Sequence, residues 1–132
     1  MPETPRVLTV HAPWAYAIIH FSKSIENRTW ETSYRGPLLI HCGQKVDDVG
    51  EFVLRKRGYP VPETYPAGHI IGRVQLVDCI FDSGRPWGEK GAWHWVLEDP
   101  EPAARPLATR GKQGLYFPPP GWESAFNEPR NT

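Results

Sequence analysis

The sequence predicts a small, mainly β fold of the α+β class, a barrel of about five or six strands with two helices at its edge. Fifteen prolines and twelve glycines among 132 residues divide the chain into short segments joined by turns. Segments with strand-like patterning outnumber the segments with helical patterning, of which we find two. The length is that of one domain, and 39% hydrophobic residues can form a core without disulfides or metal.

The first part of the chain predicts a strand, a helix and two further extended segments. Residues 7–11 (VLTVH) form a short strand. Pro13 suits the first turn of a helix over residues 14–21, which is apolar nearly all round and therefore buried. Residues 24–30 (SIENRTW) are extended, and residues 37–43 (PLLIHCG) form a buried strand because their apolar run is continuous.

Residues 45–58 form the clearest amphipathic helix of the sequence. Its first turn is acidic and its last turn basic, an order that complements the helix dipole, and Gly58 can cap its end. We therefore attribute the basic triplet at 55–57 to the helix and favour this over a nucleic-acid patch. The apolar face is marked by three valines with a phenylalanine beside them: Val46, Val49, Val53 and Phe52.

The second half predicts further strands. Residues 68–81 form a long strand, in which Gly72 marks a bulge or a close approach of another segment. Residues 92–100 alternate in a strand pattern. The proline-rich residues 101–106 then break the chain, and residues 107–117 complete the fold.

We expect one domain over residues 1–117, followed by a proline-rich tail, residues 118–132, that is only partly ordered. Fifteen basic residues balance fifteen acidic ones, so no overall field attracts long nucleic acid, and such a role needs a local patch or a base-reading pocket. Cys42 and Cys79 fit buried thiols of a reducing cytoplasm. No signal peptide and no bilayer-length apolar stretch is visible, so we expect a cytoplasmic protein without a membrane partner. The oligomeric state stays open.

Ionisable residues crowd just ahead of the strand at 37–43. Alternate side chains of an extended segment share a face, so Glu26, Arg28 and Trp30 point together, close to Lys23. An exposed ion pair between Glu26 and Arg28 is the simpler interpretation and has little energetic weight. The alternative is that these charges line a cleft that binds a ligand.

A ligand cleft needs matching groups from a second segment, and two are available. One is the loop with Tyr34 and Arg35. The other is the segment with Arg110, Lys112 and Gln113, whose neighbouring glycines let backbone amides approach a ligand, although an ordinary turn explains it equally well. We expect at least one residue of this last segment to share one cleft with the charges around Glu26.

Motifs for other chemistry are missing. The five histidines form neither HxH nor HExxH, residues 110–114 lack the Walker spacing, and no serine lies in GxSxG. We therefore expect no metal and no cofactor.

The stretch VLTVHAPWAYAIIHFSKSIENRTWETSYRGPLLIHCG resembles the opening of an ASCH domain, of the PUA-like superfamily. It is similar in its first strand, its PWA-type helix and a GxKxxExR-like motif, in which Lys23, Glu26 and Arg28 match and Phe21 replaces the glycine. The later stretch AWHWVLEDPEPAARPLATRGKQGLYFPP resembles the end of the same group. The resemblance covers residues 7–117.

The resemblance implies a small barrel with a cleft beside the first helix, lined by the motif residues. Relatives bind RNA or hold a modified base in an aromatic pocket. Some ASCH proteins remove an acyl group from N4-acylated cytidine, using a lysine equivalent to Lys23, a threonine three residues later and a separate acid. Here Glu26 stands in place of that threonine.

Three functions follow, of which we favour binding of RNA or a modified nucleotide. The alternatives are an amidohydrolase, with Lys23 as base and Glu26 beside it, and a ribonuclease. On the binding hypothesis Glu26→Gln weakens binding by roughly 1–3 kcal/mol and leaves the melting temperature almost unchanged. The candidates for stacking on a base are Trp14, Trp30 and Tyr34. The candidates for hydrogen bonds to the edge of a base are Lys23, Glu26, Arg28 and Gln113. The candidates for phosphate contacts are Arg35, Arg110 and Lys112.

Overall fold

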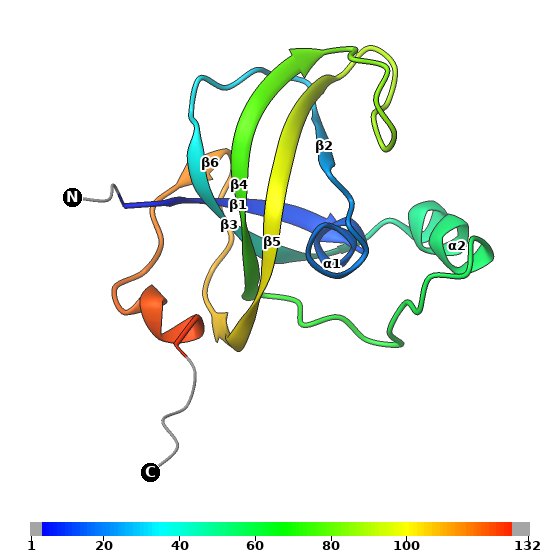
Figure 1. Cartoon of the computed structure of the whole chain (residues 1–132). Helices are drawn as coiled ribbons and strands as arrows, with labels where there is room; N and C mark the ends of the chain where they lie inside the picture. The colour runs from blue at the N-terminus through cyan, green and yellow to red at the C-terminus, as the bar shows by residue number, and fades with distance from the viewer. Residues whose placement is uncertain (1–3, 128–132) are drawn as a thin grey trace.

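The computed structural model describes residues 4–127. Six strands, two α-helices and one 3-10 helix follow one another along the chain (Figure 1). Their bounds are β1 Arg6–Ala12, α1 Trp14–His20, β2 Ile25–Arg28, β3 Gly36–Val46, α2 Asp48–Lys56, β4 His69–Phe81, β5 Trp93–Ala108, β6 Leu115–Tyr116 and η1 Trp122–Ala125.

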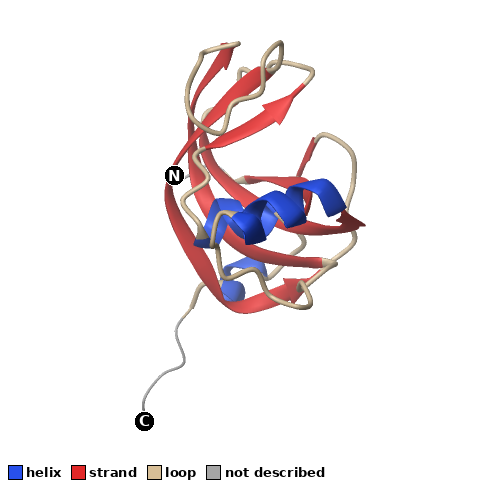
Figure 2. Ribbon diagram, turned by 90° about the vertical axis from the view of Figure 1, so that its right-hand side faces the viewer, coloured by secondary structure: helices blue, strands red, loops and turns tan. Residues whose placement is uncertain are grey.

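The six strands form one mixed sheet in the order β2-β5-β4-β3-β1-β6. β1 runs parallel to β3, and every other neighbouring pair is antiparallel. The sheet is strongly curved, and both helices lie on the same side of the molecule (Figure 2). The predicted mainly β, α+β fold with two helices is confirmed, but β2 and β6 do not pair within the described residues, so no hydrogen-bonded closure of the barrel is seen.

The core forms where α1 packs against the concave sheet. Ala15, Ala17, Ile18 and Ile19 of this helix are all buried, as its apolar sequence predicts. A methyl group added at Gly72 of β4 would lie 2.6 Å from Cδ1 of Ile19, and the ladder between β3 and β4 shifts its register nearby. The predicted close approach at this glycine is therefore confirmed.

The predicted apolar face of α2 is wrong. The helix begins at Asp48, so Val46 belongs to β3, and it buries Gly50 and Leu54. Val49 and Phe52 are 73% and 64% exposed. The helix is rotated in this way because Gly50, which has no side chain, allows α2 to approach the ring of Trp14 closely.

The expected break at residues 101–106 is also wrong, because β5 continues through its prolines to Ala108. β2 pairs only with Trp93–Val96, and Leu97 makes one further hydrogen bond on that side, to the carbonyl of Ser24. From Glu98 onward β5 pairs with β4 alone. Its other edge is free of ladder bonds there, and prolines are tolerated on such an edge. Register shifts between β4 and β5 accommodate the prolines on the edge that faces β4.

Part of the proline-rich tail is described, and it packs on the domain. Trp122 and Phe126 contact a small cluster of buried residues that includes Val7 and Leu39. Residues 128–132 of the predicted tail lie outside the described residues. No helix within residues 4–127 is long and apolar enough to cross a membrane.

Candidate functional site

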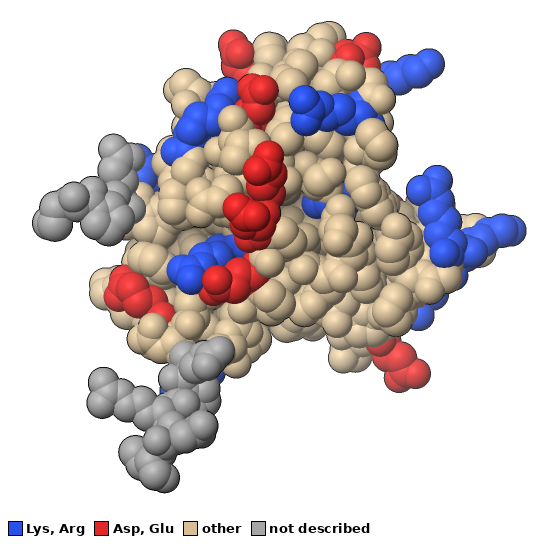
Figure 3. All heavy atoms as spheres, in the orientation of Figure 1, with Lys and Arg blue, Asp and Glu red and all other residues tan. Residues whose placement is uncertain are grey.

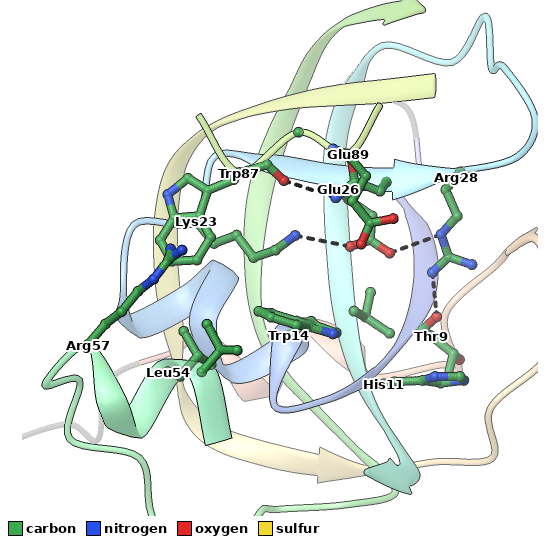
Figure 4. Close-up of a pocket in the computed structure, with 14 residues that line it drawn as sticks. Thr9, His11, Trp14, Lys23, Glu26, Arg28, Leu54, Arg57, Trp87 and Glu89 are labelled. Atoms are coloured by element: carbon green, nitrogen blue, oxygen red, sulfur yellow. Dashed lines mark hydrogen bonds and ion pairs between the residues drawn. The ribbon is translucent and has the colours of Figure 1, made fainter. Parts of the chain in front are cut away.

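A cleft of about 510 Å³ opens between the two helices, β1, β2 and the loop that joins β4 to β5 (Figure 4). Its size lies in the range of small-ligand sites. Both aromatic rings and charged groups reach it. Its lining comes from these five segments: Thr9, Val10 and His11; Trp14; Lys23, Glu26, Asn27 and Arg28; Val53, Leu54 and Arg57; Trp87, Gly88 and Glu89.

The end of α1 positions Lys23. Phe21 closes the helix with a φ of −117°, and the left-handed φ of +56° falls on Ser22. The backbone N–H of Lys23 then donates to the carbonyl of Ala17 at 3.1 Å. Phe21, in the place of the motif glycine, therefore meets no backbone strain here.

Glu26 bridges two cations inside the cleft. Its Oε1 lies 3.5 Å from Nζ of Lys23, and its Oε2 accepts a hydrogen bond from Nε of Arg28 at 3.0 Å. The side chains of Lys23 and Glu26 are only 4% and 9% exposed, and that of Arg28 is 23% exposed. Arg28 also donates from Nη2 to the carbonyl of Thr9 at 2.8 Å, which ties β2 to β1. The predicted shared face of Glu26 and Arg28 is confirmed.

Burial dominates the titration of Lys23. Desolvation lowers the pKa of its amine below the ordinary value, because the charged form is disfavoured away from water. The nearby Glu26 carboxylate raises the pKa and opposes this effect only in part. Nζ also donates to the carbonyl of Ile25. The amine is thus fixed in position and has a weakened hold on its proton.

Trp14 forms an aromatic wall of the cleft, and α2 holds it in place. Its Nε1 donates to Oδ2 of Asp47 at 3.0 Å, while Oδ1 of the same carboxylate caps α2 by accepting from the N–H of Gly50 at 3.0 Å. These two hydrogen bonds, the Gly50 contact first, lower the pKa of Asp47. Nζ of Lys23 lies 5.5 Å from the centre of the Trp14 ring, within cation–π range.

The loop between β4 and β5 is fastened over the cleft by two anchors, the half-buried Asn27 and the buried His94. Asn27 donates from Nδ2 to the carbonyl of Trp87 at 3.0 Å and accepts from the N–H of Glu89 at 2.8 Å. His94, 1% exposed, accepts at Nδ1 from the N–H of Ser83, so its Nε2 carries the proton and donates to the carbonyl of Glu89 at 2.7 Å.

Gly88 completes this arrangement. A methyl group at this position would lie 2.4 Å from the imidazole of His94, so only glycine allows the loop to pack directly on the ring. The interpretation of His94 as a packed wall residue is confirmed. The loop covers the His94 face at the start of β5, which explains why His94–Leu97 are buried on both faces although the sequence alternates.

The structure brings only some of the predicted site residues together. Trp14, Lys23, Glu26 and Arg28 line the cleft. Trp30, Lys112 and Gln113 line a second hollow, which Arg28 shares, and Arg110 lines a third hollow together with Lys112 and Gln113. The expectation that one cleft holds Lys23, Glu26, Arg28 and a residue of the segment 110–113 is therefore wrong. The segment 110–113 lines two adjoining hollows instead.

Tyr34 and Arg35 lie outside the cleft. The hydroxyl of Tyr34 donates to the carbonyl of Pro37 at 2.6 Å, and its ring lies 5.4 Å from the guanidinium of Arg6. Arg35 pairs with Asp78 at 3.7 Å. Both residues thus serve contacts on another part of the surface.

Sequence reasoning missed most of the lining, since only four of its fourteen residues were predicted. Leu54 lies on α2, whose orientation was wrongly predicted, and Arg57 directly follows this helix. Arg57 belongs to the basic triplet that we attributed to the helix alone. Arg55 of that triplet does pair with Glu51 at 2.9 Å within the helix. The only signal for Trp87 and Gly88 was a Gly- and Pro-rich loop. Within residues 4–127, no group of three or more His, Cys, Asp or Glu side chains is placed to hold a metal.

A family model confirms what the motif suggested. The model of the ASCH domain matches residues 8–105. The chain belongs to the ASCH domain family. The match begins in β1 and ends in β5, so this ASCH domain includes every element that lines the cleft.

Two curated proteins resemble this ASCH chain in sequence. Activating signal cointegrator 1 of Homo sapiens is 36% identical over 81 residues, and that of Mus musculus is 35% identical over 81 residues. Each alignment covers 55% of this chain and 14% of the relative. The chain therefore corresponds to a small part of these proteins.

Solved structures share the fold. The crystal structure of ASCH from Zymomonas mobilis has a TM-score of 0.56 and 16% identity, and it covers 89% of both chains. A mutant of the same protein gives the same TM-score and identity, with 89% of this chain and 92% of that chain covered. At this identity the likeness concerns the fold alone.

Proposed function

We propose that this ASCH domain binds RNA or a modified nucleotide by holding one base in the cleft. One observation carries the proposal, which is that a buried ion pair, Lys23 with Glu26, faces a hollow instead of a packed core. Buried charges are costly unless they are paired, and a pair that only stabilised the fold could be replaced by apolar residues. Binding and catalytic sites are where such partly desolvated charged groups cluster.

The groups around the cleft match the needs of a nucleobase. Trp14 and Trp87 offer flat apolar surfaces on which a base can stack. The carboxylate of Glu26 has unused lone pairs that can accept from a base amino group, and the amine of Lys23 can donate to a ring nitrogen or carbonyl. The overall net charge of zero suits such a pocket better than a surface that binds long duplexes.

Titration with a panel of ribonucleosides and short single-stranded RNAs tests the proposal. The comparison is between wild type and Lys23→Met, which keeps the apolar stem and removes the charge. Lys56→Met is the matched control, since Lys56 is an exposed lysine of α2 outside the lining of the cleft. Loss of a charged hydrogen bond weakens binding by roughly 1–3 kcal/mol.

We expect this loss for Lys23→Met and unchanged binding for Lys56→Met. Equal binding by wild type and both variants would show that the ligand does not bind in the cleft. Binding to none of the probes would remove base recognition altogether.

A second candidate, hydrolysis of a nucleoside amide, rests on the lowered pKa of Lys23. A lysine whose amine loses its proton more readily is a more effective general base than an ordinary lysine. Incubation with N4-acetylcytidine tests this chemistry, because deacylation releases free cytidine. A catalytic role predicts release by wild type and none by Lys23→Met, whereas a binding module releases no cytidine at all.

A further inference from the structure

Two more hollows adjoin the cleft along β1. The second hollow has about 580 Å³ and shares Thr9, His11 and Arg28 with the cleft. The third has about 590 Å³ and shares Thr9, Lys112 and Gln113 with the second. Thr9 thus borders all three hollows, and together they form a track from the cleft to the segment 110–113.

The end of the track at the segment 110–113 carries positive charge that no acidic partner neutralises. Among residues 4–127, neither Arg110 nor Lys112 forms an ion pair, whereas Arg35, Arg55 and Arg73 all do. The exposed acidic residues of β5, Glu98, Asp99 and Glu101, lie elsewhere. Figure 3 shows a column of acidic side chains on the face over β5. These acidic residues over β5 form no ion pair with Arg110 or Lys112 among residues 4–127.

A fixed aromatic ring lies in the second hollow. Trp30 is 37% exposed, and its ring stands edge-on against the buried Trp95 with centroids 4.8 Å apart. The indole N–H of Trp95 donates to the carbonyl of Trp30 at 3.2 Å. Trp30 therefore presents an open, immobilised ring beside the cleft, as base-stacking platforms do.

The segment 110–113 is also held in place. Nε2 of the buried His41 donates to the carbonyl of Thr109 at 2.8 Å, and Nδ1 lies 3.1 Å from Oγ1 of Thr9. A methyl group at Gly111 would lie 3.0 Å from both His41 and Thr9, so the loop rests directly on β1 and β3. Arg110 and Lys112 extend from a rigid base, which reduces the entropy lost when they bind phosphate.

We propose that the ligand is a single-stranded nucleic acid that follows this track. One base enters the cleft, the neighbouring base stacks on Trp30, and the adjoining phosphates face Lys112 and Arg110. This inference rests on the proposed function, because the cleft supplies the first base position. It adds that a segment of about three nucleotides is recognised, so a free nucleoside fills only part of the site.

The test compares a nucleoside monophosphate with a fluorescein-labelled, mixed-sequence single-stranded RNA of about eight nucleotides. Anisotropy titrations at several salt concentrations use wild type, Arg110→Glu, Lys112→Glu and Trp30→Ala. Arg105→Glu is the matched control, because Arg105 is exposed on β5, borders none of the three hollows and changes the net charge equally. Trp30→Phe retains a stacking ring and controls for folding, which circular dichroism checks for each variant.

We expect the RNA to bind more tightly than the monophosphate. Arg110→Glu and Lys112→Glu each flatten the slope of log K against log salt by about 0.7, while Arg105→Glu leaves it unchanged. Trp30→Ala weakens RNA binding about tenfold and Trp30→Phe much less. Each of these substitutions changes the affinity for the monophosphate less than the affinity for the RNA.

Other outcomes separate this inference from the proposed function. If the monophosphate binds and the RNA binds no more tightly, the strand path is overturned while the base site stands. It is also overturned if Lys112→Glu and Arg105→Glu act alike, or if a duplex of the same sequence competes as well as the single strand. If neither probe binds, the proposed function fails and this inference fails with it.

Discussion

Glu26→Gln tests how much the ion pairs of Glu26 with Lys23 and Arg28 stabilise the fold around the cleft. The substitution keeps the shape of the side chain and removes its charge, so Lys23 and Arg28 lose their common partner. Removing one member of a buried ion pair usually costs 3–5 kcal/mol. Arg28 is partly exposed and keeps the carbonyl of Thr9, and Lys23 keeps that of Ile25, so we expect the low end, about 3 kcal/mol.

For a chain of this size that loss corresponds to a fall in Tm of roughly 10 °C. The burial of Glu26 thus revises the expectation, drawn from sequence, that the same change leaves the melting temperature almost unchanged. Lys23→Met has a different result, because Glu26 stays paired with Arg28 and the desolvated amine is gone. We expect this variant to lose less than about 1 kcal/mol.

The pH dependence of the free energy of unfolding tests the same ion pair independently. The pKa of Lys23 in the folded protein lies below the value of 10.5 that it has when unfolded. Between the two values the unfolded state binds more protons, so the free energy of unfolding rises with pH. Loss of the Glu26 carboxylate lowers this pKa further, so the rise is larger in Glu26→Gln and absent in Lys23→Met.

Urea unfolding of wild type and the two variants, at neutral pH and near pH 9.5, measures these differences. The reasoning is refuted if Glu26→Gln is as stable as wild type at neutral pH. It is equally refuted if Lys23→Met is the less stable of the two variants.

Three further predictions concern the supports of the cleft. Gly→Ala stabilises an ordinary helix by up to about 1 kcal/mol. Gly50→Ala is expected instead to lower the Tm and weaken base binding, because the added methyl group would lie 2.3 Å from the Trp14 ring. An unchanged Tm would contradict this packing. Gly88→Ala, whose methyl group would meet the imidazole of His94, should accelerate hydrogen exchange of the loop amides, and unaltered exchange would count against the anchor. Asp47→Ala should cost about 1–2 kcal/mol. The pKa of Asp47 in the folded protein is below its ordinary value of 3.8, so the stabilisation by its charge is present above pH 3.8 and is lost as pH falls through the folded pKa. Between about pH 5 and pH 3, Asp47→Asn should therefore lose less stability than wild type in denaturant titrations. Parallel losses in the two proteins would contradict this.

Local patterns predicted the elements that begin the cleft. The apolar run after Pro13 identified α1, and the period of two in an extended segment placed Glu26 and Arg28 on one face. The acidic first turn and the glycine at position 58 identified α2. Each of these features depends on neighbours in the sequence, and propensity and periodicity report such neighbours well.

Contacts between distant segments could not be predicted in this way. The apolar face of α2 was misjudged because its orientation is set by the fit of Gly50 to Trp14, which lie on different helices. The continuation of β5 through its prolines depends on which stretch of it β2 covers. The loop over the cleft is likewise fixed by His94 and Asn27, which a linear pattern does not connect to it.

The most direct test of the account is a crystal structure with a short single-stranded RNA bound. The account predicts one base in the cleft, against Trp14, with its polar edge within hydrogen-bonding distance of Glu26 or Lys23. It predicts the following phosphates beside Lys112. A bound strand that leaves the cleft unoccupied, with its bases on the exposed face of α2 or along β5, would contradict the account.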